Sequence, residues 1–423
     1  MLARQNELLS NHYLSGASLY KRLVGVGKLR LWLLRNFPSA YQGLPFILRP
    51  GRSSVAVLRL LGAAADRRST YGNSVTNRIS RTLFWPLVNL YDSYYHANCL
   101  LRSRSSLFDP LLVLRIYYFA IFYNVPPLEF VIYGFHLRDR RKLVHLYLYS
   151  TDFLALPSVN GLSGAKDEDV GNKFCFANIC SEFGLPHVPT IAAFEAGRQI
   201  TPPTRVRPKI LFSKALRGQN SLGAEVWTLN GRHYRSSRGK LFDWEQLLGH
   251  LRAHDCILQP FVRNHDRVAS ITNGKTACLR IVTAGDGQSV SHVVGALLVV
   301  PVAGLVSSTG GIVCGVNLQT GTVIGTVNLS TGETPAYHPD TGYRLRGFVL
   351  PFWRQSVELV QKAHSRAFSS FFSLGWDVAL TGRGPVILET NSNWGAMHHQ
   401  LFSGPIGSTS FSPVLEERLK LCV

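Results

Sequence analysis

The chain has 423 residues, of which 46% are hydrophobic, 11% aromatic and 17% charged. This length allows two or three domains, and the composition is that of a folded, somewhat apolar protein. The spacing of the seven cysteines excludes a zinc ribbon and argues against a disulfide framework, so we expect a reducing, cytoplasmic setting. The cysteines are Cys99, Cys175, Cys180, Cys256, Cys278, Cys314 and Cys422.

The N-terminus does not resemble a signal peptide, because Arg4 and Glu7 interrupt it and no apolar core follows. The most apolar stretch, residues 111–135, is broken by Arg115 and Glu129, which leaves no uncharged run of the ~18–20 residues that a membrane-spanning helix needs. We expect a buried helix here, with a helix resting on a membrane surface as the alternative. The second case would place the protein at the inner membrane face.

Positive charge is concentrated at the start of the chain. Residues 1–150 hold 20 Lys and Arg against 6 Asp and Glu, and they therefore carry +14 of the total +20. Such a region suits an anionic membrane surface or a simply solvated helical domain. The basic residues are dispersed and no nucleic-acid-binding motif accompanies them. Nucleic acid therefore ranks below a membrane surface, and both rank below no specific anionic partner.

Three zones follow one another along the chain. Residues 1–145 are rich in Leu, Tyr and Arg at helical spacing and predict a basic, mostly helical domain. Residues 146–266 mix short strands with helices and predict a small lobe. The expected strands of this zone and its boundary are 144–149, 209–214 and 257–262, and the expected helices are 170–183 and 244–254.

The third zone, residues 267–423, is dominated by strands and predicts a large lobe. Strands 277–283 and 290–300 form a hairpin candidate around the turn 285–287. Residues 354–372 predict one amphipathic helix. A last hairpin is expected from Gly375 to Asn391.

The strongest chemical signal lies on that last hairpin. A three-residue turn at 382–384 would place Asp377 opposite Glu389, roughly 5 Å apart. Asn391 lies two residues beyond Glu389 and shares its face. Two carboxylates and an amide oxygen would then converge on one face of the hairpin.

Unpaired carboxylates so placed repel each other and are costly to desolvate, and a hard divalent cation such as Mg²⁺ relieves both costs. The alternative is an exposed face whose acids point to water. We expect Ile387 and Ala379 beside the acids, which favours a covered face and hence the metal. The opposite face is expected to carry Trp376, Val378, Val386 and Leu388.

Three basic residues complete the pattern. Lys173 is expected inside the helix 170–183, and Lys214 ends a strand just before a Gly-containing loop that begins at Arg217. A lysine at such a strand end can reach phosphate oxygens, although either lysine alone would usually be a surface residue. Arg280 interrupts an apolar strand, where a structural salt bridge and a phosphate clamp are equally reasonable.

The order of these features resembles the ATP-grasp family, and more narrowly the sugar-transfer-associated ATP-grasp group, which is related to α-L-glutamate ligases. The resemblance covers roughly residues 144–407. It implies an α+β, two-lobed ATP-grasp fold with an additional helical N-terminal domain. The roles that it implies are ATP phosphate contacts for Lys173 and Lys214, adenine contacts at Gln259 or Phe261, phosphoryl stabilisation by Arg280, and Mg²⁺ ligation by Asp377, Glu389 and Asn391.

The resemblance also implies a reaction. A carboxylate substrate attacks the γ-phosphate of ATP to give an acyl phosphate and ADP, and an amine substrate then displaces phosphate to form an amide. The group's name associates this chemistry with surface polysaccharide or sugar-linked metabolites. The alternatives are a kinase of the same fold that phosphorylates a hydroxyl, and a membrane-surface scaffold with a relic nucleotide site.

Overall fold

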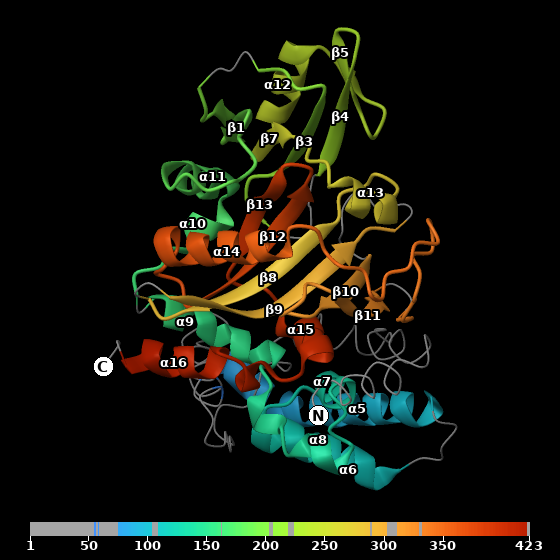
Figure 1. The fold of residues 1–423 in the computed structure, drawn as a ribbon. Coiled ribbons are helices and arrows are strands. Elements are labelled where there is room, and N and C mark those ends of the chain that lie inside the picture. Colours follow the sequence, from blue (N-terminus) through green and yellow to red (C-terminus); the bar gives the residue numbers. More distant parts are fainter. Residues whose placement is uncertain are drawn as a thin grey trace.

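The computed structural model describes residues 75–420, with gaps at 104–108, 162, 203–205, 219–223, 288–289, 303–310 and 330–331, together with Val55 and Leu58. Two antiparallel sheets lie one above the other, and helices cover the larger sheet on both faces (Figure 1). This arrangement confirms the predicted α+β class. The two sheets span residues 192–260 and 278–391, on either side of the predicted boundary at 266–267.

The described part of the N-terminal region is helical, as predicted. Its elements are α5 (Val75–Ser103), α6 (Pro110–Tyr123), α7 (Pro127–Ile132) and α8 (Arg138–Arg141). Asp109 begins α6 by accepting hydrogen bonds from the first free backbone N–H groups, and Pro110 supplies the fixed φ of a first helical residue. Asn124 ends it in the left-handed conformation. The apolar stretch 111–135 is therefore two short helices rather than one.

The strand predicted at residues 144–149 is wrong. The segment forms a 3₁₀ turn, η2 (Val144–Leu146), and then an irregular stretch. Its backbone has no strand partner because the amide of Gln400 accepts the N–H of Leu148 at 2.8 Å and donates to the Leu148 carbonyl at 2.7 Å. A second 3₁₀ segment, η3 (Ser150–Ala155), and α9 (Leu156–Gly161) follow.

The helix predicted at 170–183 is divided in two. α10 (Asp167–Gly171) ends at Asn172, which then caps α11 (Lys173–Glu182) through its side-chain oxygen. Because the Asn172 cap has an extended backbone, the two helices cannot be continuous. Lys173 is therefore the first residue of a helix and not an interior one.

The smaller sheet has seven strands in the order β2-β1-β7-β3-β4-β5-β6. The predicted strands 209–214 and 257–262 correspond to β3 and β7, which pair with each other, and the predicted helix 244–254 corresponds to α12 (Trp244–Arg252). The strands are β1 (Ala192–Glu195), β2 (Arg198–Gln199), β3 (Ile210–Ala215), β4 (Glu225–Asn230), β5 (His233–Ser236), β6 (Leu241–Phe242) and β7 (Cys256–Pro260).

The larger sheet has six strands in the order β11-β10-β9-β8-β12-β13. The predicted hairpin is β8 paired with β9. The strands are β8 (Cys278–Gly285), β9 (Ser291–Val300), β10 (Ile312–Val316), β11 (Val323–Asn328), β12 (Ser373–Thr381) and β13 (Gly384–Asn391). α13 (Asp266–Thr272) connects the two sheets.

One face of the larger sheet packs against α14 (Trp353–Ala367), the helix predicted at 354–372. This helix ends earlier than predicted because Phe368 leaves the helical conformation, with φ −130° and ψ 27°. Arg418 donates hydrogen bonds to the carbonyls of Ser369 and Ser370, which follow it. The opposite face packs against α15 (Ala396–Ser403), a 3₁₀ turn, η4 (Ile406–Ser408), and α16 (Phe411–Lys420).

The C-terminal helices also hold the N-terminal helices. Met397 and Leu401 of α15 pack on the aromatic core of α5–α7, and the Gln400 amide donates a hydrogen bond to the Tyr133 hydroxyl at 3.0 Å. The helical region thus lies directly below α15 in Figure 1.

The register of the last hairpin differs from the prediction in two places. The turn has two residues, because Thr381 pairs with Gly384. A bulge then shifts the pairing of β12 with β13 between Asp377 and Val378. The two differences cancel, so Asp377 does pair with Glu389. The bulge nevertheless places Ile387 opposite Val378 in the core under α14, and Val386 opposite Ala379 on the acidic face. Our assignment of Ile387 and Val386 to faces was therefore wrong.

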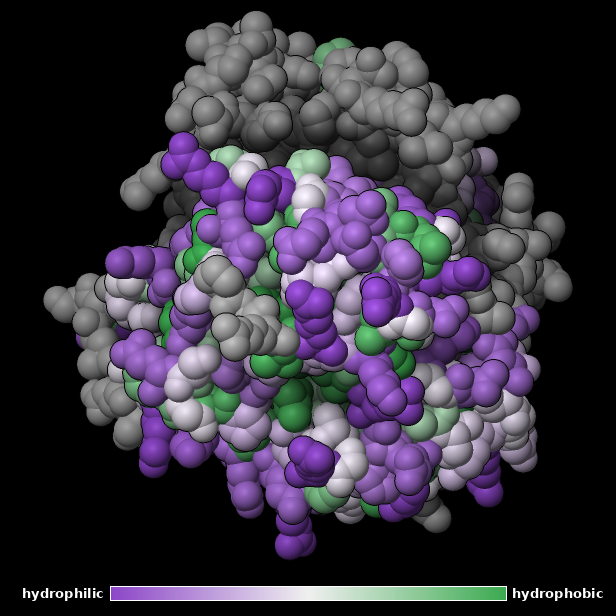
Figure 2. Space-filling view, turned by 90° about the horizontal axis from the view of Figure 1, so that it is seen from above, coloured by the Kyte–Doolittle hydropathy of each residue, from purple (hydrophilic) through white to green (hydrophobic). Residues whose placement is uncertain are grey.

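Within the described part of the chain, every helix is too short or too polar to cross a membrane. Viewed from above, over the smaller sheet, the surface is mostly hydrophilic, and hydrophobic atoms show mainly in hollows between polar side chains (Figure 2).

Candidate functional site

A pocket of about 180 Å³ lies where the smaller sheet, α10–α11 and the end of β13 meet. Three of the predicted residues line it, namely Lys173, Glu389 and Asn391. Asn391 thus shares the pocket with Glu389. The remaining lining residues are Asp167, Val170, Gly171, Gly218, Thr390 and Ser392.

Lys173 is held at this pocket by backbone contacts. Its N–H, left free at the start of α11, donates to the Leu216 carbonyl just after β3, at 3.0 Å. Its ammonium donates to the carbonyl of Gly218 at 2.9 Å. Burial lowers the pKa of Lys173, which the charge of Glu389 partly offsets. The loop predicted after Arg217 continues through residues 219–223, which lie outside the described residues.

Lys214 and Glu389 form an ion pair across the two sheets. The Lys214 Nζ lies 2.8 Å from Glu389 Oε2, and only 11% of the lysine side chain and 27% of the glutamate side chain are exposed. Burial alone would raise the pKa of Glu389, but the charges of Lys214 and Lys173 outweigh it and lower the pKa to about 2. Glu389 is therefore an anion at any physiological pH.

Arg280 and Asp377 form a second ion pair beside the first. The guanidinium donates from Nε and Nη2 to the two carboxylate oxygens, each at 2.7 Å. They face each other because β8 and β12 are neighbours and place these two residues in register. The Asp377 charge raises the pKa of Arg280 further. Arg280 therefore has the salt bridge that was one of its two predicted roles, while its side chain stays 34% exposed.

The two residues predicted near adenine lie on β7 and just after it. Gln259 pairs with Phe212, which lies two residues before Lys214. Gln259 and Lys214 therefore lie on the same face of the smaller sheet. The Gln259 side-chain amide donates to the Val188 carbonyl at 3.2 Å. The backbone N–H of Phe261 donates a hydrogen bond to the Ile210 carbonyl at 3.0 Å. An adenine contact by these residues stays a prediction.

The donor set fits a hard cation in chemistry. Asp377 and Glu389 are paired across the hairpin, and Asn391 adds an amide oxygen. Carboxylate and amide oxygens are ligands that Mg²⁺ prefers. Among the described residues no group of three or more His, Cys, Asp and Glu could hold a metal by itself. Mg²⁺ commonly takes only one or two carboxylates and completes its shell with water and phosphate, so a set of this size agrees with an ATP-linked ion.

Some features of the site were missed in the sequence. The Asn172 cap that orients Lys173 is one, although an Asn before an apolar helical run is a recognised helix-start signal. Burial of the acidic face by α15 is another. The small residues Gly295 and Gly375 allow His399 and Trp394 to lie against the sheet, since a Cβ at either position would come within 2.8 Å of them.

The model of the sugar-transfer-associated ATP-grasp family matches residues 162–408, which is more than half of the chain and includes both sheets. The chain belongs to this family. The resemblance and the ATP-grasp fold predicted from the sequence are thereby confirmed, and the family match supports nucleotide binding by an ATP-grasp enzyme. No curated protein matched the chain.

Three solved structures are similar to the chain at low identity. One is the ADP complex of N5-carboxyaminoimidazole ribonucleotide synthetase (11% identity, 61% of this chain and 57% of that chain, TM-score 0.36). Another is an L-amino acid ligase from Bacillus licheniformis (13%, 63% and 53%, TM-score 0.35). A third is D-alanine–D-alanine ligase from Bacillus anthracis, complexed with ATP (11%, 59% and 65%, TM-score 0.32). The chain spans just over half the length of the first two.

Proposed function

We propose that this ATP-grasp protein is an ADP-forming carboxylate–amine ligase. The main support for the proposal is the Lys214–Glu389 ion pair. It joins a lysine of the smaller sheet, which is suited to bind phosphate, to a carboxylate of the larger sheet, which is suited to bind a metal ion. A ligand with both phosphate and metal would satisfy the two partners separately. The pocket beside them, with Lys173 and Asn391, would take the phosphate end of that ligand.

Each charged residue then has a stated task. Lys173 and Lys214 bind phosphate oxygens, and Gln259 or Phe261 contacts adenine. Asp377, Glu389 and Asn391 hold Mg²⁺, which when bound would offset negative charge on the phosphates. The part-exposed guanidinium of Arg280 stabilises the charge that develops on the transferring phosphoryl group. Binding requires Lys214 and Arg280 to exchange their carboxylate partners for phosphate.

The proposed reaction has two balanced steps. A substrate carboxylate oxygen bonds to the γ-phosphorus while the bond to the β–γ bridging oxygen breaks, which gives an acyl phosphate and ADP. A neutral amine then attacks the acyl carbon, phosphate leaves, and the amine loses a proton to give the amide. The family's description connects it with sugar transfer, and we propose a role in surface polysaccharide or sugar-linked metabolite synthesis.

The test is a screen of carboxylic acids and amines for ADP release that depends on both substrates, with mass spectrometry of the products. A new amide supports the ligase. Release of ADP with a phosphorylated hydroxyl would instead support a kinase of the same fold. Absence of ATP binding would support the scaffold with a relic nucleotide site.

We also propose that the helical region contacts an anionic membrane surface from the cytoplasmic side. Leu111, Leu114 and Tyr118 lie on one side of α6 with 67%, 57% and 40% of their surface exposed. Burial and the neighbouring charges of Arg115 and Arg138 lower the pKa of Arg141, so these guanidinium groups gather close to that side. Exposed apolar residues beside clustered arginines suit a membrane interface.

A further inference from the structure

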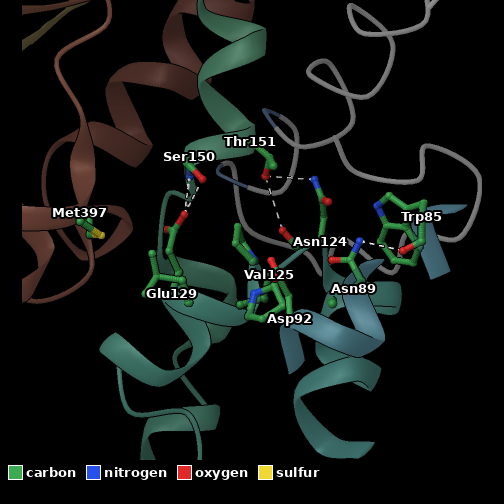
Figure 3. Close-up of a pocket in the computed structure, with 13 residues that line it drawn as sticks. Trp85, Asn89, Asp92, Asn124, Val125, Glu129, Ser150, Thr151 and Met397 are labelled. Atoms are coloured by element: carbon green, nitrogen blue, oxygen red, sulfur yellow. Dashed lines mark hydrogen bonds between the residues drawn. The ribbon is translucent and has the colours of Figure 1, made fainter. Parts of the chain in front are cut away.

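The polar side chains of one pocket in the helical region bond to one another. This pocket has a volume of about 410 Å³ and lies beside α6, α7 and η3 (Figure 3). Glu129 accepts hydrogen bonds from the N–H and the hydroxyl of Ser150, at 3.0 and 2.5 Å, and Asn124 donates to the Thr151 hydroxyl at 3.1 Å. The pocket of about 180 Å³ that Lys173 lines, the nucleotide pocket, differs because a segment 45 residues later holds its lysine.

Lys173 is held at two points by the segment that follows β3. Its backbone N–H donates to the Leu216 carbonyl at 3.0 Å, and its ammonium donates to the Gly218 carbonyl at 2.9 Å. Gly218 lines the nucleotide pocket together with Lys173, and its φ of +104° is one that favours glycine. The position of the ammonium therefore depends on where residues 216–218 lie.

The side chain of Arg217, which lies between those two carbonyls in the chain, attaches this segment to α10 and β1. Its guanidinium donates from Nε to Glu168 Oε2 at 3.3 Å and from Nη2 to Glu168 Oε1. Its third nitrogen, Nη1, donates to Glu195 on β1. The planar guanidinium thus binds two carboxylates from different elements, which an ammonium group could not do with the same geometry.

Glu168 also acts on the other side of Lys173. The Asn172 amide donates to Glu168 Oε1 at 2.7 Å, while the Asn172 oxygen caps α11, of which Lys173 is the first residue. The hydrogen bonds from Arg217 and then from Asn172 lower the pKa of Glu168, so it stays ionised. Glu168 therefore connects the start of α11 with the segment that accepts the Lys173 ammonium.

These ion pairs are too exposed to be important for folding. The exposed fraction of the side chain is 45% for Arg217, 50% for Glu168 and 35% for Glu195. Ion pairs at this exposure contribute little to stability, whereas fixing the groups that support a binding residue is important for a site. Their removal should therefore change the geometry of the nucleotide pocket without unfolding the chain.

We propose that Arg217 and Glu168 are positioning residues that hold the Lys173 ammonium at the phosphate end of the nucleotide pocket. The inference rests on the proposed function, in which Lys173 binds phosphate oxygens of ATP. Neither Arg217 nor Glu168 is among the described residues that line the pocket, so both act through residues 216–218 and the Asn172 cap. An ammonium has three N–H donors, so Lys173 can bind phosphate while one donor stays on Gly218.

The first experiment compares Glu168→Ala with Asp169→Ala by calorimetry of Mg·ATP binding to the whole chain. Both variants remove one negative charge from α10, but in the described part of the chain only Glu168 of the two accepts from Arg217 and Asn172. Loss of negative charge by itself favours the anionic ligand. We expect Glu168→Ala nevertheless to bind about tenfold more weakly, as for a lost hydrogen bond to a charged group, and Asp169→Ala to bind no more weakly than wild type. Equal or tighter binding by Glu168→Ala would overturn the proposal.

The position of the lysine can also be measured without nucleotide. Hydrogen–deuterium exchange of the amides at 173–176 and 216–218 should be faster in Glu168→Ala and Arg217→Ala, because bonds that fix both segments are lost. Arg217→Lys should resemble Arg217→Ala, since it keeps the charge but not the fork of donors. Arg252→Ala, at an exposed position of α12, is the control. Unchanged exchange in both Glu168→Ala and Arg217→Ala would contradict the positioning role.

A double variant shows whether Glu168 acts through Lys173. Lys173→Ala with Glu168→Ala should bind Mg·ATP no more weakly than Lys173→Ala alone, because the group that Glu168 positions is already absent. A further loss in the double variant would overturn the proposal. If exchange rises as expected but Lys173→Ala binds Mg·ATP as wild type does, the phosphate role of Lys173 in the proposed function fails while its positioning by Glu168 and Arg217 stands.

Discussion

At the scale of single residues, the charges of the site neutralise one another in two cross-strand or cross-sheet pairs. Glu389 forms an ion pair with Lys214, and Asp377 forms one with Arg280. Each pair lies partly in protein, where removing one partner is more costly than it would be on an open surface. These pairs explain how two adjacent acids can be tolerated before any cation binds.

Arg280 should affect chemistry more than nucleotide affinity. Arg280→Ala should lower turnover by about 10²–10³-fold, as for loss of one preorganised donor, with a smaller change in the Kd for ATP. Arg280→Lys should recover part of the stability but little of the rate, because it cannot donate two parallel hydrogen bonds. Arg354→Ala on exposed α14 is the control. Equal losses in kcat and ATP affinity would make Arg280 a binding or folding residue instead.

The low pKa of Glu389 predicts how acid affects stability. A carboxyl group whose pKa falls from the ordinary 4.5 to about 2 on folding stabilises the native state above pH 4.5. That contribution disappears as pH falls from 4.5 towards 2. The difference in unfolding free energy between wild type and Glu389→Gln should therefore shrink across this window and stay constant above it. Denaturant titrations should show no such trend for Glu358→Gln, whose side chain is exposed.

At the scale of elements, the sequence indicated which strands exist better than how they are paired. Apolar runs bounded by polar and turn residues located β3, β8 and β9 closely. The turn length of the last hairpin could not be read, because Gly382, Arg383 and Gly384 fit a two- or three-residue turn equally. The bulge beside Asp377 adjoins Ile387, whose backbone pairs with Pro186 and Val188 far earlier in the chain, a contact that no local pattern contains.

The prediction of a strand at residues 144–149 failed for a similar reason. Its β-branched and aromatic residues favour a strand, but a glutamine some 250 residues later satisfies its backbone. Lys173, Lys214, Glu389 and Asn391 were singled out from residue type and position along the chain, and the structure brings three of them to one pocket beside Lys214.

The contact of α15 with the sheet can be tested by a matched pair of substitutions. Gly315 and Gly325 are cross-strand partners under Phe402, and a Cβ would lie 2.3 Å from Phe402 at the first and 3.1 Å at the second. Gly315→Ala should destabilise the protein by about 1–3 kcal/mol through overpacking, and Gly325→Ala by clearly less. Thermal unfolding decides this, and equal Tm values for the two variants would show that Phe402 moves away freely.

At the scale of the whole molecule, α15 connects the parts. It covers the face of the larger sheet that carries the acids, and it packs against the N-terminal helices. The helical region is thus joined to the larger sheet through α15.

Membrane binding predicts a dependence on lipid charge. The chain should bind vesicles rich in phosphatidylserine more tightly than phosphatidylcholine vesicles, and added salt should weaken binding. Replacing Arg138 and Arg141 by Gln should reduce binding about thirtyfold, at about 1 kcal/mol per arginine. Arg354→Gln is the control. Sedimentation showing no preference for anionic vesicles at low salt would remove the membrane from the account.

Glu389 pairs with Asp377 and lies two residues before Asn391, and we propose that it helps to hold Mg²⁺ with ATP. The most direct measurement is thermal stabilisation by ATP as Mg²⁺ is titrated, in wild type, Glu389→Gln and Glu358→Gln, because it needs no turnover. We predict that Glu389→Gln folds but requires about tenfold or more Mg²⁺ for the same rise in Tm, since one anionic ligand is lost. Glu358→Gln should follow wild type. If Glu389→Gln kept the wild-type Mg²⁺ dependence, the metal site assigned to this hairpin would be wrong.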